Sequence, residues 1–284
     1  MTPALTAGPV VFVALIAAAA LHAGWNAFLK LKIEPFMALT LMILSCAVIG
    51  LPFAIVLGVP RMAAWPWMFG SIVLHLCYNL TLAEAYRRAE MSQVYPVARG
   101  GAPLLTAIAT FILIAEPISP LATAGVVVLG FGVILISLGG RKNVRMDRTA
   151  LGFALATATI IAFYTLVDGL GARVSHAPGS YTATLFVLDC IPLTAVALWR
   201  RGLRPVLGLA RHAPQGLFAG TMAVTSYWIA IWAMTVAPIA VVAALRGTGV
   251  LFSVILGTFL LKEKFHPVRW IAAGLIVVGI GLIH

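Results

Sequence analysis

The chain is dominated by apolar runs of about 20 residues, separated by short polar or proline-containing gaps. A helix needs about 20 such residues to cross the hydrocarbon core of a bilayer, and it satisfies its own backbone hydrogen bonds there. The sequence therefore predicts an all-α membrane protein with ten transmembrane helices. Their approximate bounds are 10–29, 36–57, 65–86, 92–114, 119–138, 150–168, 182–199, 214–233, 238–260 and 268–283.

Composition excludes an ordinary soluble enzyme. Hydrophobic residues make up 62% of the 284 positions and charged residues 10%, against about 45–50% and about 25% in soluble domains. The net charge of +11 comes mainly from basic residues in the gaps, which indicates membrane topology rather than a nucleic-acid partner. The sequence has no cysteines at disulfide or zinc-ligand spacing, and we expect neither a metal nor another cofactor.

Lysine and arginine residues are distributed very unevenly between the two predicted membrane faces. Of the 19, 15 fall in the gaps after the first, third, fifth, seventh and ninth helices, whereas only Arg61 and Arg173 fall on the other face. Because basic loops stay in the cytoplasm, this 15:2 asymmetry predicts that both termini lie outside. The remaining two residues, Arg99 and Arg246, lie inside predicted helices.

The chain carries an internal repeat with a shift of 147 residues. The matches include charged residues and prolines, which mean more than matching leucines: Arg99 with Arg246, Glu116 with Glu263, and Pro120 with Pro267. Because each half has an odd number of helices, the second half enters the membrane from the opposite side. We therefore expect a 5+5 inverted repeat, residues 1–140 and 141–284, with a site near mid-depth. Such a fold suits a carrier that opens alternately to either side.

These features resemble the EamA-type carriers of the drug/metabolite transporter superfamily. The resemblance rests on the repeat, on Glu116 and Glu263 closing the fourth helix of each EamA-like half, and on the stretches 21–30 and 94–103. The nearest functional analogues are the YddG-type exporters of aromatic and other amino acids. The resemblance implies export of small metabolites across the bacterial inner membrane through a central cavity. It also implies cytoplasmic termini, in contrast to the charge distribution.

The two arginines inside predicted helices are the most informative residues. An arginine in the middle of a membrane helix costs at least about 2.5 kcal/mol, so each should face a wet cavity or an acidic partner. Pro103 cannot donate a hydrogen bond to the carbonyl of Arg99, and Gly100 loosens the same stretch. We expect Arg99 and its repeat mate Arg246 to hold the carboxylate of a substrate, with a structural ion pair as the alternative.

Polar and aromatic side chains inside the predicted helices are expected to line the same cavity: Trp25, Asn26, His75, Tyr78 and Trp228. Their alternative role is hydrogen bonding between helices. Asp189, in the middle of the predicted helix 182–199, is expected either to pair with one of the arginines or to relay protons. Glu116 and Glu263 are expected to close helix ends.

We expect a monomer in the lipid bilayer that exports amino acids, with this small-molecule substrate as its partner. Transport of phosphorylated or sugar metabolites is a second carrier function, because it too needs basic residues in the cavity. A lipid-modifying membrane enzyme and a structural membrane subunit are the alternatives from other classes. The stretch 168–173 matches the DGxxAR core of CDP-alcohol phosphotransferases, but that chemistry needs four carboxylates around two metal ions. The other three positions are Thr165, Phe186 and Cys190, so the sequence disfavours this enzyme.

Overall fold

The computed structural model describes residues 8–28, 33–89, 91–138, 147–252 and 267–283, and within these ranges it contains helices and turns but no strand. The helices are α1 (Pro9–Phe28), α2 (Pro35–Leu57), α3 (Trp65–Arg88), α4 (Met91–Leu113), α5 (Pro120–Leu138), α6 (Arg148–Ser175), α7 (Pro178–Arg201), α8 (Leu203–Gly208), α9 (Ala213–Val236), α10 (Ile239–Gly247) and α12 (Pro267–Ile283). Two 3-10 turns, η1 (Met62–Ala64) and η2 (Leu209–His212), precede α3 and α9. The all-α class is confirmed for this part of the chain.

Every predicted apolar run overlaps a helix, but α6 and α7 are longer than predicted. Their ends carry polar residues such as Arg173 and Arg200, which hydropathy assigns to the gaps although the backbone stays helical. The predicted run 238–260 begins as α10, and its part beyond residue 252 lies outside the described residues.

The molecule is a multi-pass membrane protein. Four helical stretches in the described residues are long and apolar enough to cross a bilayer: Pro35–Leu57, Arg148–Ser175, Pro178–Arg201 and Leu203–Val236. The other apolar helices are shorter within the same residues. Large apolar side chains such as Ile55, Phe111 and Trp199 are exposed on the outside, as lipid contact requires. The number of ten spans stays a prediction.

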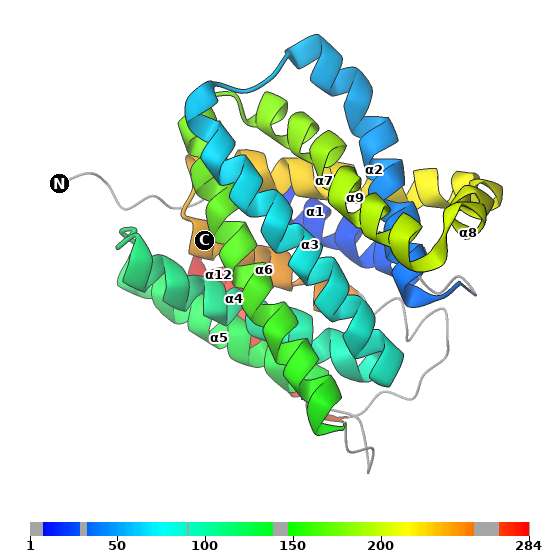
Figure 1. Cartoon of the computed structure of the whole chain (residues 1–284). Helices are drawn as coiled ribbons and strands as arrows, with labels where there is room; N and C mark the ends of the chain where they lie inside the picture. The colour runs from blue at the N-terminus through cyan, green and yellow to red at the C-terminus, as the bar shows by residue number, and fades with distance from the viewer. Residues whose placement is uncertain (1–7, 29–32, 90, 139–146, 253–266, 284) are drawn as a thin grey trace.

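The helices pack in pairs that join the two halves of the chain (Figure 1). α5 packs on α12, α2 on α7 and α4 on α10, while α3 packs on α6 and α1 on α9. Matching the helices of the two halves in chain order pairs α1 with α6 and α3 with α9. Under this match, the contact between α1 and α9 corresponds to the contact between α6 and α3. The pattern of contacts is thus preserved when the two halves are exchanged.

Glycines permit the closest of these approaches, as small residues commonly do between membrane helices. A Cβ on Gly125 of α5 would lie 2.8 Å from the carbonyl oxygen of Gly279 of α12. A Cβ on Gly216 of α9 would lie 2.6 Å from Oγ of Ser45 of α2. Gly274 has no such role, because its Cβ position faces open space.

Candidate functional site

A cavity of about 90 Å³ lies at the centre of the bundle, with walls from both halves of the chain. Its polar and aromatic lining comes from α1, α2, α3, α4, α6, α7, α9 and α10: His22, Trp25, Cys46, His75, Tyr78, Asn79, Arg99, Tyr164, Phe186, Asp189, Tyr227 and Arg246. A second hollow of about 50 Å³ shares His22, Arg99 and Arg246 with it. These three basic side chains therefore border both spaces.

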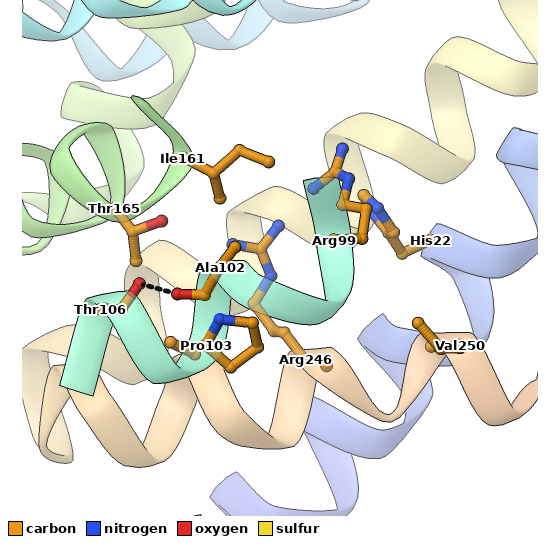
Figure 2. A pocket seen from close by; sticks show the side chains of 12 residues that line it. His22, Arg99, Ala102, Pro103, Thr106, Ile161, Thr165, Arg246 and Val250 are labelled. Carbon is orange, nitrogen blue, oxygen red and sulfur yellow. Dashed lines mark hydrogen bonds between the residues drawn. The ribbon is translucent and has the colours of Figure 1, made fainter. Parts of the chain in front are cut away.

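Arg99 projects from α4 beside His22 of α1 (Figure 2). Its Nη2 donates to the hydroxyl of Tyr78 on α3 at 2.9 Å, and its Cζ lies 5.6 Å from the centre of the Tyr78 ring. Pro103 follows four residues later in α4, so the carbonyl of Arg99 lacks its usual helical donor. Tyr78 thus orients this guanidinium from α3.

Arg246 reaches from the last turn of α10 toward α4 (Figure 2). Its Cζ lies 5.0 Å from the centre of the Tyr227 ring, in cation–π geometry. No acidic side chain of the described residues lies within 4.0 Å of its guanidinium. The charge of Arg246 therefore faces a cavity, an aromatic ring and no counter-ion in this part of the chain.

The hydroxyl of Tyr227 is hydrogen-bonded to a buried carboxylate. Its hydroxyl donates to Oδ2 of Asp168, and the hydroxyl of Tyr181 donates to Oδ1 at 3.1 Å. Asp168 is fully buried on α6, and the two hydroxyls satisfy both of its oxygens. This arrangement fixes the ring on which Arg246 rests.

An aromatic wall, made of the rings of His75, Tyr78, Tyr164, Phe186 and Tyr227, lines part of the cavity. The imidazole of His75 stacks on Tyr164 with ring centres 4.3 Å apart, and Tyr78 meets the edge of the same ring at 5.6 Å. Phe186 packs edge-on against Tyr227 at 6.0 Å. His75 Nδ1 lies 3.0 Å from the carbonyl oxygen of Ser71, so its ring is fixed from its own helix. The wall offers flat apolar surface with few free donors.

The structure brings together six of the eight residues predicted for the site: Trp25, His75, Tyr78, Arg99, Asp189 and Arg246. Trp228 does not line this cavity, because α9 turns it outward against Phe53, with ring centres 5.3 Å apart. The side chain of Asn26 lies outside the part of the chain that the structure describes. Substrate binding by these residues stays a prediction.

Asp189 does not act as the counter-ion of an arginine in this structure. Its side chain is 5% exposed and lines the cavity, and its Oδ1 accepts no hydrogen bond from any described residue. The predicted pairing with an arginine is therefore wrong for this conformation, since α7 presents Asp189 to the cavity instead.

Several lining residues were not among the predicted set, notably His22, Tyr164 and Tyr227. His22 accepts a hydrogen bond from Nε1 of Trp25 at 3.2 Å. A signal for Tyr164 existed in the sequence, because it occupies the end of the sixth predicted helix where the first has Trp25. Tyr227 directly precedes the tryptophan that was chosen in its place, so the correct helix was identified with the wrong face.

Glu116 closes one end of the bundle rather than touching the cavity. Its Oε1 accepts from Nη2 of Arg173 at 2.6 Å, and its Oε2 accepts from the backbone N–H of Ile239 at 2.8 Å. Arg173 also donates to the carbonyl oxygens of Met234 at 2.7 Å and Ala237 at 3.0 Å. The predicted helix-end role of Glu116 is thus confirmed, while Glu263 lies outside the described residues.

The DGxxAR stretch shows no catalytic arrangement in the described residues. Asp168 is engaged by two tyrosines and Arg173 by Glu116, and the two side chains serve separate contacts. Within the described ranges, no group of three His, Cys, Asp or Glu side chains is placed to hold a metal ion.

Known proteins resemble the chain in sequence and in fold. Residues 148–284, which lie within the second predicted repeat, match the EamA-like transporter family. The uncharacterized transporter YwfM of Bacillus subtilis (strain 168) is 25% identical over 219 residues, which cover 76% of this chain and 72% of that protein. A solved crystal structure that is 19% identical covers 96% of this chain, and this chain covers 94% of that one, with a TM-score of 0.74. The similarity in fold extends over nearly the whole chain.

Proposed function

We propose that the chain is a transporter of the EamA-like family, whose model matches residues 148–284, and that it exports amino acids or related small metabolites by alternating access. It is a membrane transporter of the drug/metabolite type. The proposed substrate class rests on the position of Arg246. This residue faces the central cavity beside Arg99 and has no acidic partner in the described residues. An arginine in that position can bind an anion that the described residues do not supply.

The two guanidiniums form the anion-binding end of the cavity. Guanidinium groups bind carboxylates through paired, charge-assisted hydrogen bonds, each stronger than a bond between neutral groups. Tyr78 and Tyr227 hold Arg99 and Arg246 through their rings, and Tyr78 also accepts a hydrogen bond from Arg99. Arginines held in this way are preorganised for a carboxylate and lose little entropy when it binds.

The aromatic wall binds the apolar side chain of the substrate. Tyr164, Phe186 and the stacked His75 line the same cavity as the two arginines. A large apolar or aromatic side chain gains buried area and ring contacts there. This division of the cavity favours aromatic and other amphipathic amino acids over small polar metabolites.

Alternating access follows from the two halves, residues 1–140 and 141–284. The helix contacts follow an exchange of the halves, which supports an inverted repeat that rocks about a central site. The ion pair from Glu116 in the first half to Arg173 in the second ties the halves together at one end. Opening toward that end requires this ion pair to break.

The carrier lies in the bacterial inner membrane, acts as a monomer, and has both termini outside. The 15:2 distribution of Lys and Arg supports this orientation, because the basic loops stay in the cytoplasm. A thiol-specific impermeant reagent applied to intact cells that carry a cysteine near either terminus tests it. Labelling without permeabilisation supports the orientation, and labelling only after permeabilisation contradicts it.

Two other functions are outcomes of the same experiment on the substrate. Organic phosphates could also bind the two arginines, and a lipid-modifying enzyme would release a product from lipid. Purified protein in proteoliposomes, loaded with unlabelled phenylalanine, is expected to take up labelled phenylalanine by counterflow with saturation. Excess leucine should compete, whereas glycerol phosphate should not. Competition by the phosphate alone would assign the second carrier function.

The arginine clamp is tested with Arg99→Ala in the same vesicles. We expect counterflow of phenylalanine to fall to the level of empty vesicles, while the protein still inserts and elutes as one species. Arg204→Ala, which removes an exposed arginine of α8 that does not line the cavity, is the matched control and should retain full counterflow. Undiminished counterflow with Arg99→Ala would contradict the clamp.

A further inference from the structure

Asp189 is the one acidic side chain among the described residues that line the central cavity. It lies in the middle of α7 and is 5% exposed. Its Oδ1 is buried and accepts no hydrogen bond from any residue that the structure describes. Neither oxygen has an arginine, lysine or histidine nitrogen within 4.0 Å in this part of the chain. The cavity therefore holds an acceptor group without a donor.

The neighbouring carboxylate shows how unusual this is. Asp168, also buried in the bundle, has a tyrosine hydroxyl on each of its oxygens. A buried polar group without a partner costs about 1–3 kcal/mol, and a charged one costs more, especially inside a membrane. The fold thus supplies a hydrogen-bond donor to each oxygen of Asp168, whereas the described residues supply none to Oδ1 of Asp189. The two residues nevertheless lie on helices that contact each other.

The backbone beside Asp189 is also short of donors. Pro192 lies inside α7, three residues later, and has no N–H. The carbonyl of Leu188 therefore lacks the helical donor that residue 192 would normally supply, although Leu188 is not among the residues that line the cavity. An ammonium group, which has three N–H donors and a positive charge, matches the Asp189 carboxylate better than a neutral hydroxyl does.

The residues that line the cavity carry charges of both signs. Arg99 and Arg246 supply positive charge on α4 and α10, Asp189 supplies the acceptor on α7, and the aromatic wall with His75, Tyr164 and Phe186 lines the same space. We propose that Asp189 binds the ammonium group of a zwitterionic substrate, so that the cavity selects zwitterions over simple carboxylates. This inference rests on the proposed transport of amino acids and assigns the half of the substrate that the arginines leave unbound.

The test compares ligands that differ only in the amino group. Binding of phenylalanine and of 3-phenylpropionate, and of 4-aminobutyrate and of butyrate, is measured by calorimetry on purified protein at one pH. The wild type is expected to bind each amino acid at least tenfold more tightly than its deaminated partner. In Asp189→Asn this ratio should fall to about one, because the amino acids lose affinity and the plain acids do not.

Two further variants keep the result interpretable. Asp189→Glu retains the carboxylate and should retain part of the preference for zwitterions. Arg246→Ala should weaken both members of each pair and leave their ratio above one. A wild type that binds the deaminated acids as well as the amino acids would overturn the role of Asp189 and leave the carrier function standing. A wild type that binds neither class would overturn the proposed function as well.

A proton-carrying role predicts a different pattern. Asp189→Asn would then leave both affinity ratios unchanged and abolish only the acceleration of uptake by a pH gradient across the vesicle membrane. Counterflow at equal pH on both sides separates the two roles, because no gradient acts in that assay. An unchanged ratio in Asp189→Asn, whether or not gradient-driven uptake is lost, overturns the binding role of Asp189. Thermal melting of each variant verifies that it is folded.

Discussion

Arg173 and Arg246 are two arginines of one membrane bundle with opposite surroundings. Arg173, at the end of α6, donates to Glu116 and to two backbone carbonyl oxygens. Arg246, in α10, faces a cavity with an aromatic ring beside it and no acidic partner in the described residues. The first guanidinium has its acceptors within the protein, so its role is structural. The second has capacity for an anion that the described part of the protein does not provide.

Removal of Arg173 is expected to change the stability of the fold, and removal of Arg246 is expected to change substrate binding. Removing a guanidinium whose partners are internal leaves a buried carboxylate and two carbonyls without a donor, which destabilises the fold. Removing a guanidinium that faces a cavity leaves open space where water can enter. Substitution of Arg173 should therefore lower the free energy of unfolding, whereas substitution of Arg246 should lower transport.

After the complete loss expected for Arg99→Ala, the largest expected effect is that of Arg246→Ala on counterflow. We expect phenylalanine counterflow to fall at least about 100-fold, because a charge-assisted pair with the carboxylate is lost, while the melting temperature stays within a few degrees. Arg246→Lys should retain part of the activity, since it keeps the charge but loses the paired geometry. A large fall in melting temperature with Arg246→Ala would place this residue in the same class as Arg173.

Arg173→Ala should show the reverse pattern. We expect the free energy of unfolding to fall by about 2 kcal/mol, since Glu116 is left nearly buried without its ion-pair partner. Affinity for phenylalanine in detergent should stay within about threefold of the wild type. Denaturant titration and calorimetry measure the two quantities. Glu116→Gln, which can still accept from Ile239, should cost less than Glu116→Ala.

A smaller effect is expected from Tyr78→Phe. The variant keeps the ring beneath Arg99 and removes only the hydroxyl that accepts from Nη2. A net hydrogen bond contributes about 1 kcal/mol, so the dissociation constant for phenylalanine should rise about fivefold. A loss as complete as that of Arg99→Ala would mean that Tyr78 contacts the substrate directly.

The smallest effect is expected from Trp228→Phe. Its ring packs against Phe53 outside the cavity, and a phenyl ring keeps much of that contact. Affinity should change less than about twofold. The matched variant Tyr227→Phe removes a hydroxyl bonded to Asp168 and should change both affinity and stability more. An effect of Trp228→Phe as large as that of Tyr227→Phe would show that the cavity wall extends further along α9.

Hydropathy and charge predicted much of the fold from the sequence. A run of 20 apolar residues has few alternatives to a helix in lipid, and Arg99 and Arg246 stood out because charge inside such a run is costly. The spacing of Glu84, Arg87 and Arg88 in the sequence indicates local ion pairs along one helix, and the structure has them with N–O distances of 2.6 and 2.8 Å.

The contacts between distant helices could not be predicted in the same way. Asp168 meets Tyr227 across 59 positions, and Glu116 meets Arg173 across 57, so no local pattern joins them. The misplacement of Trp228 has a related cause. α9 is apolar on all sides, and hydropathy cannot fix the rotation of such a helix about its axis.

The central claim is that Arg99 and Arg246 face an aqueous space that the substrate enters. It is tested by replacing each in turn with cysteine in a variant that lacks Cys46, Cys77 and Cys190, and by following reaction with a water-soluble thiol reagent. Both cysteines should react in the folded protein at a rate close to that of an exposed thiol. Ala244→Cys, on the buried face of α10, should stay unreactive as the control. Reaction of neither site until the protein is denatured would contradict the account.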